Sequence, residues 1–194
     1  MNSKINVHKI TAMGLMTALV FVSNYIQFGI ETPIGPTRLH IANGICLLAT
    51  LLFGSLEGGL AAGLGSFLYD LTNPAYAATS WVTFILKFLL AFIGGLVVYA
   101  GRKEKNTPAP LWRRIVGSIA GSLSYVVLYC FKQYIEKCLI LGLEKGAVIL
   151  DIFSSKLPVS LINAAIAVPV AVLLYGAISP ALKKAGLSER MQIR

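Results

Sequence analysis

The chain consists of long apolar segments separated by short polar loops. Residues 115–131 and 157–182 contain no charged side chain, and a helix that crosses a bilayer needs about 20 apolar residues. The segments lack the alternating polar positions of a membrane β-barrel, and backbone groups in lipid must bond internally. The pattern predicts an all-α integral membrane protein, a bundle of six transmembrane helices in one domain covering residues 1–194. The expected helices span about residues 11–28, 39–53, 56–71, 81–100, 111–134 and 153–182.

The second and third segments are short for a full crossing of the bilayer. They are about 15 and 16 residues long, whereas a full crossing needs about 20. They meet at the sequence FGSLEGG, which is typical of a tight turn. We therefore expect an antiparallel helical hairpin that is thin, tilted or partly re-entrant.

Composition supports the membrane interpretation and sets an orientation. The chain is 56% hydrophobic and 13% charged, whereas soluble domains contain about a quarter charged residues. In a soluble protein the net charge of +9 would suggest a nucleic-acid partner, but in a membrane protein the enrichment of Lys and Arg in cytoplasmic loops accounts for it. Eleven Lys and Arg fall on one side and five on the other. Both termini and the basic loop GRKEKNTPAPLWRR are therefore expected in the cytoplasm.

Two charged residues occur where the bilayer disfavours them. Lys87 lies inside WVTFILKFLLAFIGG, where a charge costs a few kcal/mol unless it finds a partner or a ligand. Alternatively, the alkyl chain of Lys87 extends along the helix and carries its ammonium group to the membrane interface. Asp70 ends the third segment and can pair with Lys87, contact a ligand or remain solvated.

Further polar residues flank or enter the apolar segments. Arg38, His40 and Asn43 stand at the start of the second segment and offer donors to an anionic or heteroaromatic ligand. The alternative is that they are interfacial side chains, with Asn43 bonding a neighbouring helix. Asn163 is the strongest amide within the last segment. It either bonds a substrate or joins two helices.

Aromatic and small residues give two more signals. Tyr76, Trp81, Tyr125 and Tyr129 can stack on a ring, although the same residue types form the aromatic belt at membrane interfaces. Small residues allow close helix approach, either inside the bundle or against a partner. They include Gly14 and Ala18, four residues apart, and Gly59, Ala62, Gly63 and Gly65 in the third segment.

Signatures of catalysis are missing from the sequence. The chain has no HExxH, GxSxG or Walker phosphate-binding motif and only two histidines. Its three cysteines, Cys46, Cys130 and Cys138, lack CxxC spacing and are expected to be packing residues. We expect neither an enzyme nor a metal site nor a cofactor. Any pumping must draw energy from a partner or an ion gradient.

The order of these segments resembles the S components of energy-coupling-factor (ECF) vitamin transporters, most closely the riboflavin, pantothenate and pyrimidine-type group. The resemblance covers nearly the full length. The segments that carry it are RLHIAN, LLFGSLEGGLAAGLGSFLYDL, WVTFILKFLLAFIGGL, the basic loop and LPVSLIN.

The resemblance implies a six-helix bundle in a prokaryotic cell membrane that binds a vitamin from outside. It implies a transmembrane coupling protein and two cytoplasmic ATPases as partners, docking on a small-residue face of the first helix. Gly14 and Ala18 match that face, with glycine replacing the usual alanine. The expected substrate-binding residues are Arg38, His40, Asn43, Asp70, Tyr76, Trp81, Lys87, Tyr129 and Asn163.

The vitamin itself stays open at this point. Pantothenate, riboflavin, hydroxymethylpyrimidine and pyridoxine are all candidates. A self-sufficient secondary transporter is the alternative function. Such proteins normally show inverted repeats and broken helices. In this sequence, only the short second and third segments suggest a broken helix. An intramembrane enzyme is a third and weaker alternative, for which His40 and Asp70 are the only conceivable pair.

Overall fold

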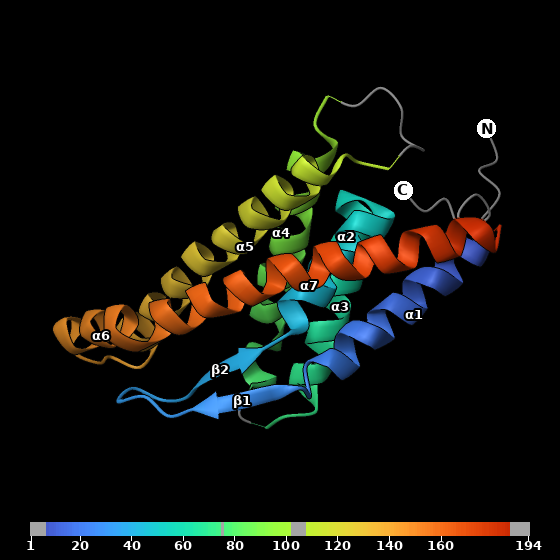
Figure 1. The fold of residues 1–194 in the computed structure, drawn as a ribbon. Coiled ribbons are helices and arrows are strands. Elements are labelled where there is room, and N and C mark those ends of the chain that lie inside the picture. The colour runs from blue at the N-terminus through green and yellow to red at the C-terminus, as the bar shows by residue number, and fades with distance from the viewer. Residues whose placement is uncertain (1–6, 75, 102–107, 187–194) are drawn as a thin grey trace.

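A computed structural model describes residues 7–74, 76–101 and 108–186 and shows a mainly helical bundle (Figure 1). Its helices are α1 (Val7–Ser23), α2 (Ala42–Phe53), α3 (Ser55–Leu71), α4 (Ser80–Tyr99), α5 (Leu111–Tyr134), α6 (Lys145–Asp151) and α7 (Leu157–Lys184). Within the described residues, three helical stretches are long and apolar enough to cross a membrane. They are Ala77–Tyr99, Leu111–Ile140 and Lys145–Lys184.

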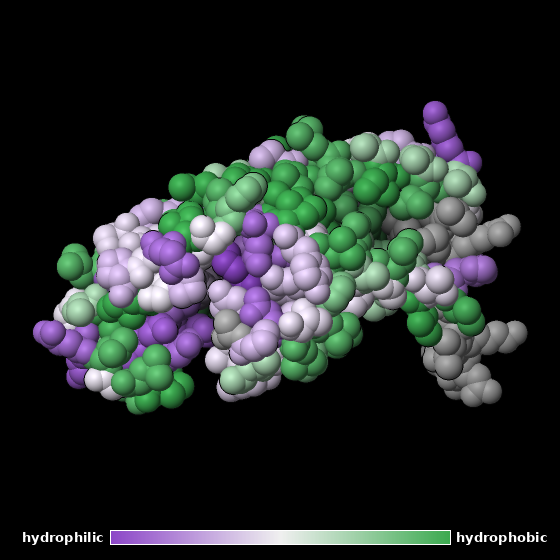
Figure 2. Space-filling view, turned by 90° about the horizontal axis from the view of Figure 1, so that it is seen from below, coloured by the Kyte–Doolittle hydropathy of each residue, from purple (hydrophilic) through white to green (hydrophobic). Residues whose placement is uncertain are grey.

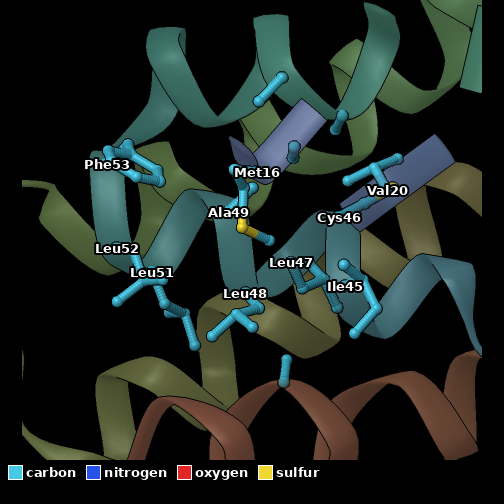
Figure 3. Packing of buried hydrophobic residues seen from close by; sticks show 14 of the residues in the cluster. Met16, Val20, Ile45, Cys46, Leu47, Leu48, Ala49, Leu51, Leu52 and Phe53 are labelled. Atoms are coloured by element: carbon cyan, nitrogen blue, oxygen red, sulfur yellow. The ribbon is translucent and has the colours of Figure 1, made fainter. Parts of the chain in front are cut away.

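Helix α2 forms the centre of the bundle. All twelve of its residues are buried, as expected for the sequence ANGICLLATLLF, which is apolar on every face. Helices α1, α3, α4 and α7 all pack against it. Figure 3 shows Met16 and Val20 of α1 lying beside the α2 side chains, with Cys46 buried among them. The bundle is thus organised around an apolar axis rather than around a polar channel.

The outer surface of the bundle is rich in large apolar side chains. Leu15 is 73% exposed, and Leu173 and Val127 are also exposed. Seen from below the view of Figure 1, much of the surface is hydrophobic, while hydrophilic residues gather in the middle and toward one end, beside a hollow (Figure 2). An apolar outer surface of this kind suits lipid as the solvent.

The close pairing of α2 and α3 depends on glycine. The two helices are joined by Gly54, whose φ of 94° disfavours other residues. One turn into α3, a Cβ at Gly58 would lie 2.5 Å from the Thr50 Cα atom of α2. The predicted hairpin is therefore confirmed, and its tightness follows from the missing side chain at Gly58.

The other α3 glycines also face neighbouring helices rather than a partner. The rings of Phe88 and Phe84, on α4, lie 2.9 Å from Cβ positions built at Gly59 and Gly63. A Cβ at Gly65 would lie 2.5 Å from the Thr17 carbonyl oxygen of α1. Of the two interpretations left open by the sequence, internal packing is the one that the structure shows for these glycines.

The expectation of a purely helical chain was wrong in the first loop. Helix α1 ends at Ser23 rather than near residue 28, and a hairpin of β1 (Gln27–Ile30) and β2 (Thr37–His40) precedes α2. The strands are antiparallel, with Gln27 opposite His40. The α1 helix stops where the Asn24 side chain donates a hydrogen bond to the Val20 carbonyl oxygen at 2.8 Å, an alternative to continued backbone bonding.

A second difference lies before the last span. The residues between the expected helices 111–134 and 153–182 contain the π-helical turn Ile135–Ile140 and α6. A further π-helical turn, Ile152–Lys156, joins α6 to α7. The hairpin and α6 lie on one side of the molecule, while the described start of α1, the end of α4 and the end of α7 lie on the other (Figure 1).

Candidate functional site

A polar cavity lies where the β-hairpin meets α3, α4, α5 and α7. Its volume of about 70 Å³ has room for several water molecules. Seven of the nine binding residues expected from the sequence line it: Arg38, His40, Asp70, Tyr76, Lys87, Tyr129 and Asn163. These residues come from segments far apart in the chain, so the fold itself creates the cluster.

Arg38, on β2, ties the hairpin to the end of α3. Its guanidinium nitrogen Nη2 lies 3.6 Å from the Asp70 Oδ1 atom, and Nη1 donates to the Gln27 Oε1 atom at 3.3 Å. The guanidinium carbon also lies 3.9 Å from the centre of the Tyr76 ring, in the geometry of a cation–π contact. Arg38 therefore links strand β1 to two residues of the cavity wall, Asp70 and Tyr76.

Asp70 has one oxygen engaged and one free. Its side chain is 2% exposed, and within the described part of the chain its Oδ2 atom has no hydrogen-bond partner. Leaving a buried acceptor unpaired costs about 1 to 3 kcal/mol. The carboxylate thus offers an acceptor to whatever enters the cavity.

Lys87 is turned into the bundle. The residue is 3% exposed, its ammonium donates a hydrogen bond to the Asn43 Oδ1 atom, and it lies 4.8 Å from the centre of the Tyr125 ring. The alternative of a lysine reaching the interface is therefore wrong for this structure. The suggested pairing with Asp70 is also not seen, because the ion pair of Asp70 is with Arg38.

Asn43 and Trp81 are the two expected residues that do not line the cavity. Asn43 is buried behind Lys87 and acts on the cavity through that lysine. Trp81 is 61% exposed, so the structure does not support the ring-stacking role expected for it. Its position at the start of α4 instead resembles an aromatic residue of the membrane interface.

Asn163 anchors β2 to α7 through its side-chain amide. The Asn163 Nδ2 atom donates to the Arg38 carbonyl oxygen at 2.8 Å, and Oδ1 accepts from the His40 backbone N–H at 2.9 Å. The nitrogen and the oxygen of the Asn163 amide therefore both bond to the backbone of β2. This role differs from both alternatives suggested by the sequence, a substrate contact and a helix-to-helix bond.

His40 presents an unsatisfied nitrogen to the cavity. Its Nδ1 atom is buried and has no hydrogen-bond partner in the described residues. Burial, followed by the nearby charges of Lys87 and Arg38, lowers the pKa of His40 well below its usual value. The imidazole is therefore neutral near pH 7 and can donate to or accept from a ligand.

Tyr125 and Tyr129 form an aromatic wall on α5. Their rings are stacked, with centroids 5.9 Å apart and planes 14° apart, and the Tyr129 hydroxyl lies 3.3 Å from the Thr37 Oγ1 atom of β2. Gln133 continues the same wall one turn further along. This spacing of Tyr125, Tyr129 and Gln133 on one helical face was a signal from which Gln133 could have been inferred.

Other cavity residues were missed by the sequence analysis. They are Asn24, Pro36, Thr37, Thr79, Thr83, Leu86, Gln133 and Ser160. Most are small polar residues of a kind that occurs throughout the loops. Ser160 is an exception, because it stands one helical turn before Asn163 and so shares its face.

The loop of the hairpin is held down by Lys156. This buried lysine donates to the Thr32 Oγ1 atom at 2.9 Å and to the Pro36 carbonyl oxygen at 3.2 Å. Its ammonium also donates to the Gly35 carbonyl oxygen and lies 3.8 Å from the Asp151 carboxylate. The strand that carries Arg38 and His40 is thus fixed at both ends.

Gly14 and Ala18 lie on the outer surface of the bundle and not in the cavity. Both are exposed on α1, and a Cβ built at Gly14 would meet no atom within 4 Å. Unlike the glycines of α3, these two residues are not used for packing within the described bundle.

Comparison with known proteins agrees with this architecture. The family model described as the S component of an ECF-type riboflavin transporter matches residues 4–180. The thiamine precursor transporter HmpT of Lactococcus lactis subsp. cremoris is 30% identical over 145 residues, which cover 63% of this chain and 86% of that protein. A solved structure of the S component of a bacterial ECF transporter superposes with a TM-score of 0.61 at 23% identity, covering 90% of this chain and 97% of that one.

These matches fix the class of protein. The family match covers most of the chain, and the structural match shows that the bundle has the fold of an ECF S component. Members of this class are subunits of membrane transporters and not enzymes. The chain belongs to the family of ECF-type riboflavin transporter S components.

Proposed function

We propose that this chain binds a vitamin or vitamin precursor in the polar cavity and delivers it across the membrane as the S component of an ATP-driven importer. The observation that carries the proposal is a buried cavity whose polar atoms are incompletely paired. The His40 Nδ1 and Asp70 Oδ2 atoms have no partner among the described residues. Because such groups are costly inside a membrane protein, a polar ligand that bonds to them would bind tightly.

Calorimetric titration of the purified chain in detergent tests this binding function. We expect saturable binding of one compound from a panel of pantothenate, riboflavin, hydroxymethylpyrimidine and pyridoxine or their close analogues, without ATP or a partner. Calorimetry is preferable to tryptophan fluorescence, because Trp81 lies away from the cavity. Absence of binding across the panel and its analogues would count against a solitary binding subunit.

The cavity side of the bundle is proposed to face outward in a prokaryotic cell membrane, with both termini in the cytoplasm. The distribution of Lys and Arg supports this orientation. In a chain without its native cysteines, a cysteine at Tyr76 should react with an impermeant reagent added outside whole cells. A cysteine at Lys105, which lies outside the described residues, should react only after the membrane is opened. The reverse pattern would overturn the orientation.

The exposed face around Gly14 and Ala18 is proposed to dock a transmembrane coupling protein that carries two cytoplasmic ATPases. Small side chains on a membrane helix let another helix approach closely. Gly14→Leu and Ala18→Leu should therefore abolish copurification with the coupling module, while ligand binding by the isolated chain stays within about twofold.

Gly176→Leu is the matched control for this experiment. Gly176 is also exposed, on α7, and a Cβ there would meet no atom within 4 Å. It should leave assembly intact. Equal loss of assembly in all three variants would show that docking is not specific to α1, and loss of ligand binding in the α1 variants would indicate misfolding.

A further inference from the structure

Three basic side chains line the cavity, and they differ in how their charge is balanced. Arg38 lies 3.6 Å from the Asp70 carboxylate. Lys132 forms an ion pair with Glu136, one turn further along the helix. Lys87 has no carboxylate within ion-pairing distance among the described residues, and its hydrogen bond goes to the neutral Asn43 amide.

Lys87 is also the most deeply buried of the three. Its side chain is almost fully enclosed, whereas the Arg38 and Lys132 side chains are about one fifth exposed, at 23% and 20%. A buried ammonium is stabilised by an amide oxygen and by the Tyr125 ring, but neither contact cancels its charge. The cavity therefore carries an excess positive charge that is concentrated at Lys87 and faces the space that a ligand would occupy.

The size of the cavity limits what can neutralise that charge. Its volume is about 70 Å³, compared with about 150 Å³ for an engineered apolar cavity that takes benzene. Pockets for drug-sized ligands are about 300 to 1,000 Å³. The cavity has less than half of the volume that holds benzene. A single ring therefore requires the walls to move apart, and a fused three-ring compound requires a larger movement. The stacked rings of Tyr125 and Tyr129 line the cavity and offer it aromatic surface against which one ring can pack.

From the charge and the size together we propose that the substrate is a small organic anion, a single aromatic or heteroaromatic ring bearing one carboxylate or similarly acidic group that binds Lys87. This inference rests on the proposed function, because it names the ligand class of the same cavity. The ring contacts the Tyr125 and Tyr129 wall, and His40 and Asp70 bond to the remaining polar groups of the ring.

Matched pairs of probes that differ only in charge test the inference. The purified chain is titrated with pyridine-3-carboxylate and pyridine-3-carboxamide, and with pyrimidine-5-carboxylate and its carboxamide, alongside riboflavin and hydroxymethylpyrimidine as uncharged vitamins. In at least one pair, the carboxylate should bind about tenfold tighter than its amide or better.

Variants of two lysines then show which lysine is responsible for the preference for the carboxylate. Lys87→Met keeps the approximate side-chain volume and should remove the preference for the carboxylate, bringing the two affinities within about twofold. Lys132→Met removes a second cavity-lining charge and should reduce the preference far less than Lys87→Met does, because Glu136 already balances Lys132. Lys87→Arg keeps the charge and should retain most of the preference for the carboxylate. This variant separates the effect of losing the charge from an effect of misfolding.

The outcomes separate this inference from the proposed function. Saturable binding of a neutral vitamin, with each carboxylate no tighter than its amide, would overturn the anionic substrate and leave the binding function standing. A carboxylate preference that survives in Lys87→Met would overturn Lys87 as the anchor. If no charged or neutral probe binds, both the anionic substrate class and the binding function lose their support.

Discussion

Gly58→Val is expected to destabilise the isolated chain by about 3 kcal/mol or more. The added Cβ would lie 2.5 Å from the Thr50 Cα atom and 2.6 Å from its backbone nitrogen. Because these are backbone atoms of the buried central helix, no side-chain rotation relieves the clash, and α2 and α3 must separate. The change is measured as a lower midpoint of thermal unfolding in detergent, followed by helical circular dichroism.

Gly14→Val is the control for the α2–α3 contact. It makes the same substitution in a helix, at a position where a Cβ would meet no atom within 4 Å. Its unfolding midpoint should stay close to that of the unaltered chain, because valine has a slightly better helix propensity than glycine. Similar losses for both variants would mean that the close approach of α2 and α3 does not govern stability.

Asn163→Leu should have the largest effect on the binding site. The substitution keeps a similar volume but leaves the Arg38 carbonyl oxygen and the His40 N–H without the amide that pairs them. Two buried backbone groups lose their partner, at a cost of about 1 to 3 kcal/mol each. Strand β2, which carries Arg38 and His40 into the cavity, is then free to move. Ligand affinity should fall about 100-fold or more, as measured by calorimetry.

Ile162→Ala tests whether any change in this part of α7 has the same effect. Ile162 is the preceding residue and is half exposed on the outer face of the helix. Its substitution should leave ligand affinity nearly unchanged. An Asn163→Leu variant that binds as tightly as the unaltered chain would show that the amide does not position β2 for binding.

The bounds of α4 and α5 could be predicted from the sequence because lipid imposes a strong length requirement. The expected segment 111–134 coincides with α5, and the expected 81–100 differs from α4 by one residue at each end. Each of these segments is long, apolar and bounded by loops that contain Gly, Pro or charged residues. For such a segment, its own sequence pattern is sufficient to predict a membrane-spanning helix, and no knowledge of the neighbouring helices is needed.

The β-hairpin could not be placed in this way. Its strands have four residues each and pair with one another, so their stability depends on contacts that a local pattern does not contain. The apolar residues Ile26 and Phe28 continue the hydrophobic run of α1, so the pattern predicts a helix that extends to residue 28. Only the Asn24 side chain, which bonds to the end of α1, marks the boundary.

The cavity residues were easier to find than their interactions. Buried charges and amides such as Lys87 and Asn163 stand out in an apolar sequence, and both line the cavity. Their partners, however, lie 44 and more than 120 residues away in the chain. A single sequence gives no distance information at that separation, which is why Lys87 was linked to Asp70 instead of Asn43.

Uptake of a radiolabelled ligand into proteoliposomes tests the central claim most directly. The ligand is the compound that binds the purified chain in calorimetry, and vesicles contain the chain alone or the chain with its coupling module. The account predicts accumulation only when the coupling module and ATP are both present, whereas accumulation by the chain alone under an ion gradient would contradict it and identify a self-sufficient transporter.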